Sequence, residues 1–391
     1  MKTILLGWEL GAGFGYCLQL RQLADALAGA GQRPVLALRT LDYAHRLFAD
    51  RTYPVLQAPW LIGRLTPQAL ADGFNPTGFA DLMACNGFGS VDHLYSMLRG
   101  WRDLIDQLRP DLIVARYAPL LTLAAYGRLP AVVFGSAYST PPADGPYFPQ
   151  LLYDVAPYAD QAQMLETVRA VQRRFGAPLP DTLAAIYRGE RRVVLGLPEL
   201  DPYRETRREP CAGMFEDAPP PREIDAEGFH AYLAGGGPTA TLAVEALIES
   251  GLPGQIYARD SDPSLAARVA DSRIRWLDAP PNAISAAAGA ALVVHHGGPG
   301  MAYAALAAGR PQALLPQVLD QWLTACALDG FPHGLLLEDG VTVRQVADRI
   351  ARLAGDSAAR QSAFDAACAI QAQGMHGAWR RVVDACLALL V

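Results

Sequence analysis

The chain has 391 residues, of which 51% are hydrophobic and 18% charged, so it is long enough for about two domains and too apolar for large-scale disorder. Its net charge of −6 argues against a nucleic-acid partner, because neutralising phosphates requires clustered Lys and Arg. The six cysteines form no C-x-x-C pair, which is typical of reduced, mostly buried thiols.

No segment has the pattern of a leader peptide or a membrane span. Glu9 interrupts the first apolar run, residues 3–8, whereas the apolar part of a secretory leader runs for about 7–15 residues. Nor does any stretch reach the roughly 18 apolar residues of a membrane helix. We therefore expect a cytoplasmic protein.

The first part of the chain, residues 1–205, alternates short apolar runs with amphipathic ones. Strand patterns occur at residues 3–8, 33–40, 53–60, 111–119, 131–137 and 191–203. Helix patterns occur at residues 17–31, 41–50, 92–110, 122–130 and 162–190. This alternation predicts a parallel sheet with helices on both faces.

Residues 206–228 have the mixed charges and prolines of a linker. A second alternating series follows, with the helix pattern 239–251 and further segments at residues 230–236, 253–260, 273–280, 290–298, 301–316 and 333–340. We predict an α/β protein with two doubly wound, Rossmann-like lobes, 1–205 and 229–365. The tail is expected to be helical from Val343 to the end, and residues 366–391 to pack back towards the first lobe.

The stretch ALVVHHGGPGMAYAALAAG contains a strand, a glycine-rich turn and a helix. Free N–H groups and the positive end of the helix dipole at such a turn can bind an anion, and His296 at the end of the strand can add a hydrogen bond. The alternative is a merely tight connection in which His296 caps a carbonyl group.

The same stretch resembles the donor-binding segment of GT-B glycosyltransferases that use UDP- or dTDP-sugars. The matching positions are His296, Gly298, Gly309, Pro311, Pro316, Asp320 and Gln321. The opening WELGAGFG and RPDLIVARYAP also resemble a bacterial subgroup of these enzymes. The resemblance implies the GT-B fold, in which two Rossmann-like lobes face each other across a cleft.

By this resemblance, the turn holds the diphosphate of a nucleotide sugar. The implied phosphate-binding residues are His296, Gly298, Gly300, Met301 and, from the preceding glycine-rich turn, Gly235. Met301 stands where the family has Ser or Thr, so one hydroxyl is missing. Because one neutral hydrogen bond contributes about 1 kcal/mol, donor binding should be weaker but retained.

The resemblance also assigns the rest of the donor. Asp320 and Gln321 would bind hydroxyls of the sugar, and Trp276 and Leu277 would contact the nucleoside. For the Asp-Gln pair the alternative is a solvated helix N-terminus, and for Trp276 it is a place in the core.

The glycines of the opening turn do not fit a dinucleotide site. Tyr16 occupies the position of the third glycine of G-x-G-x-x-G, and the second strand ends at Arg39 instead of an acid. An arginine there can favour a 2′-phosphate, so an NADP-dependent oxidoreductase stays open as an alternative.

The expected catalytic pair is replaced. Tyr16 stands where the family has a His, and Arg116 stands near the place of its Asp partner. A tyrosine ordinarily has a pKa near 10, about three units too high for a base at pH 7, although a guanidinium can supply one to three of those units. Glu9 or His93 could act instead; their structural alternatives are an acceptor of backbone N–H groups and a surface helix start.

An already ionised acceptor would need no base, and a catalytically silent, nucleotide-sugar-binding paralogue is the rival hypothesis. The resemblance implies an inverting glycosyltransferase without metal or cofactor, acting on a small-molecule or lipid-like acceptor as a monomer or homodimer. The one D-x-D motif, residues 260–262, is expected to be a solvated turn.

Overall fold

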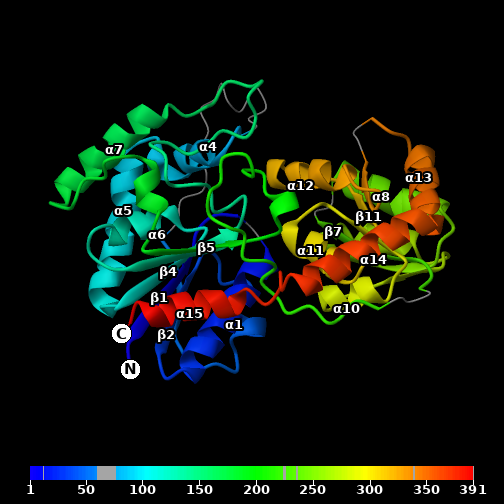
Figure 1. The fold of residues 1–391 in the computed structure, drawn as a ribbon, viewed down its shortest axis with the longest axis horizontal. Coiled ribbons are helices and arrows are strands. Elements are labelled where there is room, and N and C mark those ends of the chain that lie inside the picture. Colours follow the sequence, from blue (N-terminus) through cyan, green and yellow to red (C-terminus); the bar gives the residue numbers. More distant parts are fainter. Residues whose placement is uncertain (12, 60–75, 223–225, 235–236, 338–339, 391) are drawn as a thin grey trace. The chain divides into compact units, whose positions relative to one another are not determined.

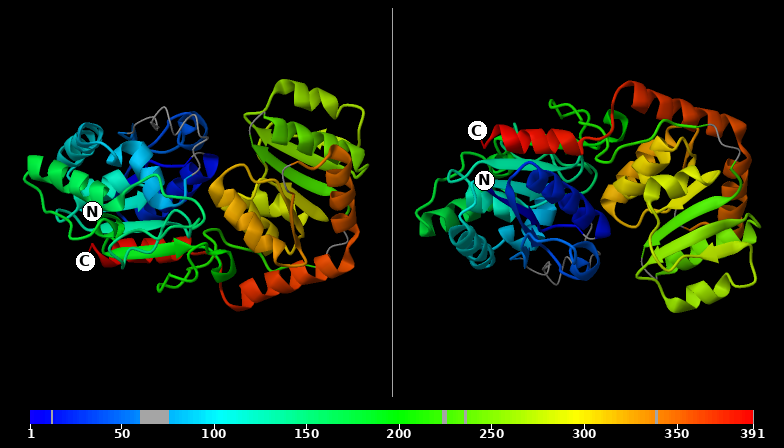
Figure 2. Two further views of the ribbon diagram at one scale, coloured as in Figure 1. Left: turned by 90° about the horizontal axis from the view of Figure 1, so that it is seen from above. Right: turned by 90° about the horizontal axis from the view of Figure 1, so that it is seen from below.

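The computed structural model describes residues 1–11, 13–59, 76–222, 226–234, 237–337 and 340–390. The chain folds into two compact units (Figures 1 and 2). The first unit contains Met1–Pro198, Pro202–Phe215 and Ala378–Val391, and the second contains Glu199–Asp201 and Glu216–Gly377.

The first unit is built on a parallel sheet with the strand order β3-β2-β1-β4-β5-β6. Its strands are β1 (Thr3–Trp8), β2 (Arg33–Leu38), β3 (Val55–Gln57), β4 (Leu112–Arg116), β5 (Ala131–Ser136) and β6 (Arg191–Leu195). Its helices are α1 (Phe14–Gly29), α2 (Ala44–Leu47), α4 (Phe79–Met83), α5 (Val91–Leu108), α6 (Pro119–Ala125), α7 (Gln161–Arg174) and α15 (Trp379–Ala388). Short helical turns are η1 (Ala84–Phe88), η2 (Ala184–Tyr187) and η3 (Pro198–Leu200), the last at the border between the units.

The second unit repeats the same topology, with the order β12-β11-β10-β7-β8-β9. Its strands are β7 (Phe229–Ala234), β8 (Gly254–Arg259), β9 (Ile274–Trp276), β10 (Leu292–His295), β11 (Gln312–Leu314) and β12 (Gly334–Leu336). Its helices are α8 (Pro238–Glu249), α9 (Pro263–Arg268), α10 (Ala283–Ala288), α11 (Pro299–Ala307), α12 (Leu319–Asp329), α13 (Val343–Gly355) and α14 (Ser357–Ala372).

Both sheets are buried on both faces, as expected of parallel sheets. In β1, Leu5 belongs to a core shared with α5 and α6, whereas Ile4 and Leu6 belong to a core shared with α1 and α15. Successive side chains of a strand point to opposite faces, so one strand supplies both cores. The predicted pair of doubly wound lobes is confirmed.

The strand order places the ligand-binding position of each unit. In doubly wound sheets, ligands bind outside the carboxyl ends of the strands, where the strand order reverses direction. That point lies between β1 and β4 in the first unit and between β7 and β10 in the second. The glycine-rich segments at residues 9–11 and 296–298 follow β1 and β10 directly.

Three segments differ from the sequence expectation. The helix expected over 162–190 ends at Arg174, and a short turn, η2, follows after Pro178 and Pro180. The tail is three helices, not one, because Asp356 caps the start of α14 and Gly374 and Gly377 have positive φ. The helical segment 79–88 was not expected; its last turn is a π-helix with Gly87 at φ 111°.

The unit boundaries also differ in detail from the expected ones. The expected boundary at 365/366 lies inside α14, which belongs to the second unit, and only α15 joins the first unit. There α15 (red in Figure 1) packs on α1 and next to β5 and β6. Val382 and Cys386 of α15 are buried in that core.

Candidate functional site

The glycine-rich turn after β10 is held by His295. The His295 Nδ1 atom accepts a hydrogen bond from the Gly297 N–H at 3.0 Å, so the ring proton lies on Nε2, which donates to Gln312 Oε1 at 2.9 Å. Burial, then the neighbouring His296, lowers the pKa of His295 to about 3. His295 is therefore a neutral support for the turn, and sequence reasoning missed this role.

Glycine is required at the centre of this turn. Gly297 has φ 87°, and a Cβ atom on it would lie 2.7 Å from the Gln321 carbonyl oxygen. The turn thus packs directly against the first turn of α12, which carries Asp320 and Gln321. The predicted phosphate and sugar segments are adjacent in the second unit.

Three of the predicted phosphate-binding residues, Gly298, Gly300 and Met301, lie at the N-terminus of α11. Gly298 is the N-cap and Pro299 the first helical residue, so Pro299 has no N–H to satisfy. The Met301 N–H is bonded to the Gly298 carbonyl at 3.1 Å. Within the described part of the chain, the N–H groups of Gly298 and Gly300 have no such acceptor, so these two are the available donors.

His296 lies against this helix end. A Cβ atom on Gly298 would be 2.8 Å from His296 Nε2, so the glycine makes room for the imidazole. Burial, then the positive charge of Arg259, lowers the pKa of His296 to about 4. No hydrogen bond reaches its buried Nδ1 atom among the described residues.

The Met301 side chain is 6% exposed and packs with Ala287, Val293 and Ala305. The Met301 side chain therefore makes core contacts and offers no hydroxyl to a ligand at this position.

Asp320 and Gln321, which were predicted to bind the sugar, lie in the first turn of α12. Burial raises the pKa of Asp320, opposed by the backbone N–H groups of Gln321 and Asp320. The Gln321 side chain accepts the Gln317 N–H at 2.9 Å.

The two residues predicted to contact the nucleoside lie at the end of β9. Trp276 ends this edge strand and packs partly on the core. The Leu277 N–H bonds to the Ile256 carbonyl at 2.8 Å. Gly235 lies outside the described residues.

In the first unit, Glu9 is 2% exposed. The two oxygens of its carboxyl group accept the N–H groups of Leu120 at 2.8 Å and Leu121 at 2.6 Å, at the start of α6. Burial raises its pKa to about 8, against the effect of these two hydrogen bonds. The structure favours the interpretation of Glu9 as an acceptor of backbone N–H groups, with both oxygens occupied.

Tyr16 and Arg116 lie together at the point between β1 and β4. The Arg116 guanidinium carbon is 4.6 Å from the centre of the Tyr16 ring, and Trp8 stacks on Tyr16 with ring centres 5.0 Å apart. Arg116 is 6% exposed, and it donates to Gln19 at 3.0 Å and to Ser139 at 3.1 Å. Arg116 therefore fixes the Tyr16 ring.

Arg39, which kept the NADP alternative open, is engaged inside the opening turn. It donates to the Gly11 carbonyl at 2.5 Å. Burial lowers its pKa, and the nearby Tyr16 and Tyr117 oppose that effect. A Cβ atom on Gly11 would meet the Tyr16 hydroxyl at 2.3 Å. The phenol, the glycine backbone and Arg39 thus form one cluster.

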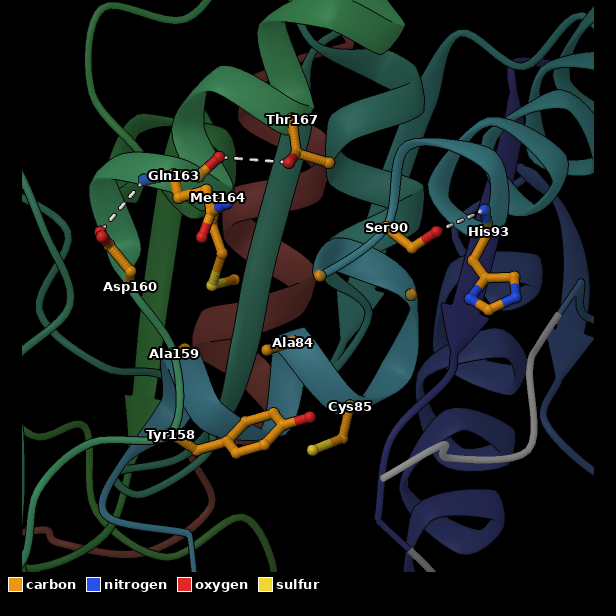
Figure 3. Close-up of a pocket in the computed structure, with 12 residues that line it drawn as sticks. Ala84, Cys85, Ser90, His93, Tyr158, Ala159, Asp160, Gln163, Met164 and Thr167 are labelled. Carbon is orange, nitrogen blue, oxygen red and sulfur yellow. Dashed lines mark hydrogen bonds between the residues drawn. The ribbon is translucent and has the colours of Figure 1, made fainter. Parts of the chain in front are cut away.

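His93 lies elsewhere in the first unit. It is in the first turn of α5, where its N–H bonds to Ser90 Oγ at 3.5 Å, and it lines a pocket of 320 Å³ between η1, α5 and α7. Figure 3 shows its ring at one edge of this pocket, with Asp160 and Gln163 at the other. Neither Glu9, Tyr16 nor Arg116 lines the pocket.

Both aspartates of the D-x-D motif contact other residues of the second unit. Asp262 caps α9 by accepting the Ser264 N–H at 2.8 Å, and Asp260 lies 3.3 Å from Arg259. No group of His, Cys, Asp and Glu able to hold a metal occurs among the residues that the structure describes.

In the same residues, no helix has the length and apolarity required to span a membrane.

Comparison with known proteins gives the following matches. Residues 235–384 match the family described as erythromycin biosynthesis protein CIII-like, C-terminal domain. This part of the chain is therefore similar to that domain. No curated protein matches the sequence.

Solved structures match over nearly the full length. CalG4, the calicheamicin glycosyltransferase, superposes with a TM-score of 0.70 at 19% identity, over 100% of this chain and 98% of the other. The kitacinnamycin glycotransferase superposes with a TM-score of 0.69 at 18% sequence identity, and the match covers 99% of this chain and 98% of the other. The spinosyn rhamnosyltransferase SpnG superposes with a TM-score of 0.65 at 20% sequence identity, and the match covers 98% of this chain and 100% of the other. The predicted GT-B fold is confirmed.

Proposed function

We propose that this protein transfers a sugar from a dTDP- or UDP-sugar to a small-molecule acceptor, inverting the anomeric carbon without a metal ion. The observation that carries the proposal is the turn after β10. There, two backbone N–H donors, a helix N-terminus and the buried His296 lie next to Asp320 and Gln321. Donors of this kind suit a diphosphate, and the adjacent acid and amide suit sugar hydroxyls.

The donor base is proposed from the neighbours. VinC was solved in complex with dTDP, and SpnG in complex with thymidine diphosphate and, separately, with the spinosyn aglycone. We therefore favour a dTDP-sugar over a UDP-sugar, and an aglycone-like acceptor over a lipid. The reaction would be a direct displacement in which the α11 N-terminus stabilises the charge of the leaving diphosphate.

Tyr16 is the proposed general base. Glu9 has both oxygens bonded to N–H groups, and His93 lines a different pocket. Arg116 cannot accept a proton, because a guanidinium stays charged in proteins. Tyr16 is held by Trp8 and Arg116 and lies beside Arg39, whose positive charge favours a phenolate.

The second candidate function is donor binding without turnover, and the replacement of the family's His and Asp by Tyr16 and Arg116 favours it. Incubation with a dTDP-sugar and a panel of aglycones, followed by mass spectrometry, separates the two. We expect a glycosylated product or released nucleotide diphosphate. Tight donor binding without either product over a long incubation would support the silent paralogue.

A further inference from the structure

Arg259 lies at the same sheet edge as the proposed diphosphate site. It is the last residue of β8 and pairs with Ala234, the last residue of β7. On the other side of β7, Tyr232 pairs with His295, and the Tyr232 ring contacts His296 with centres 5.6 Å apart. Three adjacent strands of the second unit therefore end side by side.

Two buried nitrogen atoms at this sheet edge make no hydrogen bond with any described residue, namely Arg259 Nε and His296 Nδ1. The Nε atom lies 3.3 Å from the exposed carboxylate of Asp260, and His296 has a backbone hydrogen bond with Tyr232. Buried polar groups are nearly always bonded, and an exception calls for an explanation. A bound ligand with several acceptor oxygens would satisfy both.

Arg259 is also close enough to act on His296. Its positive charge is the second cause, after burial, of the lowered pKa of His296. The guanidinium therefore lies within electrostatic range of the His296 ring and favours its neutral form. A negative group bound there would be attracted by the Arg259 charge.

The ion pair between Arg259 Nε and Asp260 is weak. Asp260 is the next residue, lies 3.3 Å away and is 76% exposed. Exposed ion pairs contribute only about 0–1 kcal/mol, so exchanging Asp260 for a phosphate is inexpensive.

We propose that Arg259 is a phosphate-binding residue, which donates to the diphosphate of the nucleotide sugar together with His296 and the α11 N-terminus. The proposal rests on the proposed function. Arg259 would also compensate for the hydroxyl that Met301 lacks, because a charge-assisted hydrogen bond is stronger than the neutral one that is missing.

The test is calorimetric binding of thymidine diphosphate and, by competition, of thymidine to the wild type, Arg259→Gln and Arg259→Lys. Arg268→Gln is the matched control, because it removes a cation of the same unit that is paired to Glu245 on the surface. We expect Arg259→Gln to weaken the binding of thymidine diphosphate about 10- to 100-fold and to leave the binding of thymidine unchanged. Arg259→Lys should recover part of the loss, and Arg268→Gln should bind as the wild type does.

Equal binding of thymidine diphosphate by the wild type and Arg259→Gln would overturn the inference and leave the proposed function standing. A parallel loss of thymidine and thymidine diphosphate would also overturn it, because it would indicate a structural role. Failure of the wild type to bind any pyrimidine diphosphate would overturn the proposed function itself.

Discussion

His295 Nδ1 accepts the Gly297 N–H at 3.0 Å, and this bond fixes the turn in which Gly297 has φ 87°. A side chain at Gly297 would be strained by about 1–2 kcal/mol and would meet the Gln321 carbonyl oxygen. The geometry of the turn thus depends on one histidine and one glycine.

Gly297→Ala should therefore lower the free energy of unfolding by about 2 kcal/mol or more and weaken nucleotide binding. Urea denaturation and calorimetry check these effects. Gly300→Ala is the control for stability, because a Cβ atom there meets nothing within 4 Å. Equal stability of the two variants would mean that the turn tolerates a side chain at Gly297.

The raised pKa of Glu9 predicts that the free energy of unfolding falls as the pH rises. Its pKa is raised from 4.5 to about 8 in the folded protein, so between these values the folded state holds a proton that the unfolded chain has released. The contribution to stability is present below about pH 4.5 and is lost as the pH rises to about 8, with a total of several kcal/mol.

Denaturation of the wild type and Glu9→Gln at pH 5.5 and 8 measures this contribution by difference. The wild type should lose more stability than the variant over that interval. A variant with the same pH dependence as the wild type would show that Glu9 is ionised throughout. All other titratable groups are common to the two proteins, so their effects cancel in the comparison.

Met301→Thr should change affinity and stability in opposite directions. The new hydroxyl adds a donor to phosphate of about 1 kcal/mol, or roughly fivefold in Kd. The loss of the buried Met side chain from its contacts with Val293 and Ala305 should lower the free energy of unfolding by about 1–3 kcal/mol. Calorimetry and thermal denaturation report the two effects separately, and unchanged affinity would place the phosphate away from residue 301.

Tyr16→Phe tests the proposed base. Removing the hydroxyl should lower kcat by about 100-fold or more, with little effect on the binding of the nucleotide sugar that we propose for the other unit. The Phe ring keeps the stacking with Trp8, so the fold should be preserved. Wild-type kcat with a neutral alcohol acceptor in the variant would exclude Tyr16 as the base.

The sequence predicted the alternating elements and both switch-point turns because their hydrophobic periodicity is local. It missed the π-helical turn η1, which has no 3.6-residue pattern and depends on Gly87 at positive φ. It could not assign Glu9, because its partners, Leu120 and Leu121, are more than 100 residues away. Arg259 could have been noticed as a charged residue that ends a strand adjacent to β7.

The most direct test of the account is calorimetric titration of thymidine diphosphate and UDP into the wild type and His296→Ala. We predict that the wild type binds at least one of the two, and that His296→Ala remains folded with the same melting temperature within about two degrees but binds at least tenfold more weakly. Equal binding by the two proteins, no binding by the wild type, or binding of NADPH in place of both nucleotides would contradict the account.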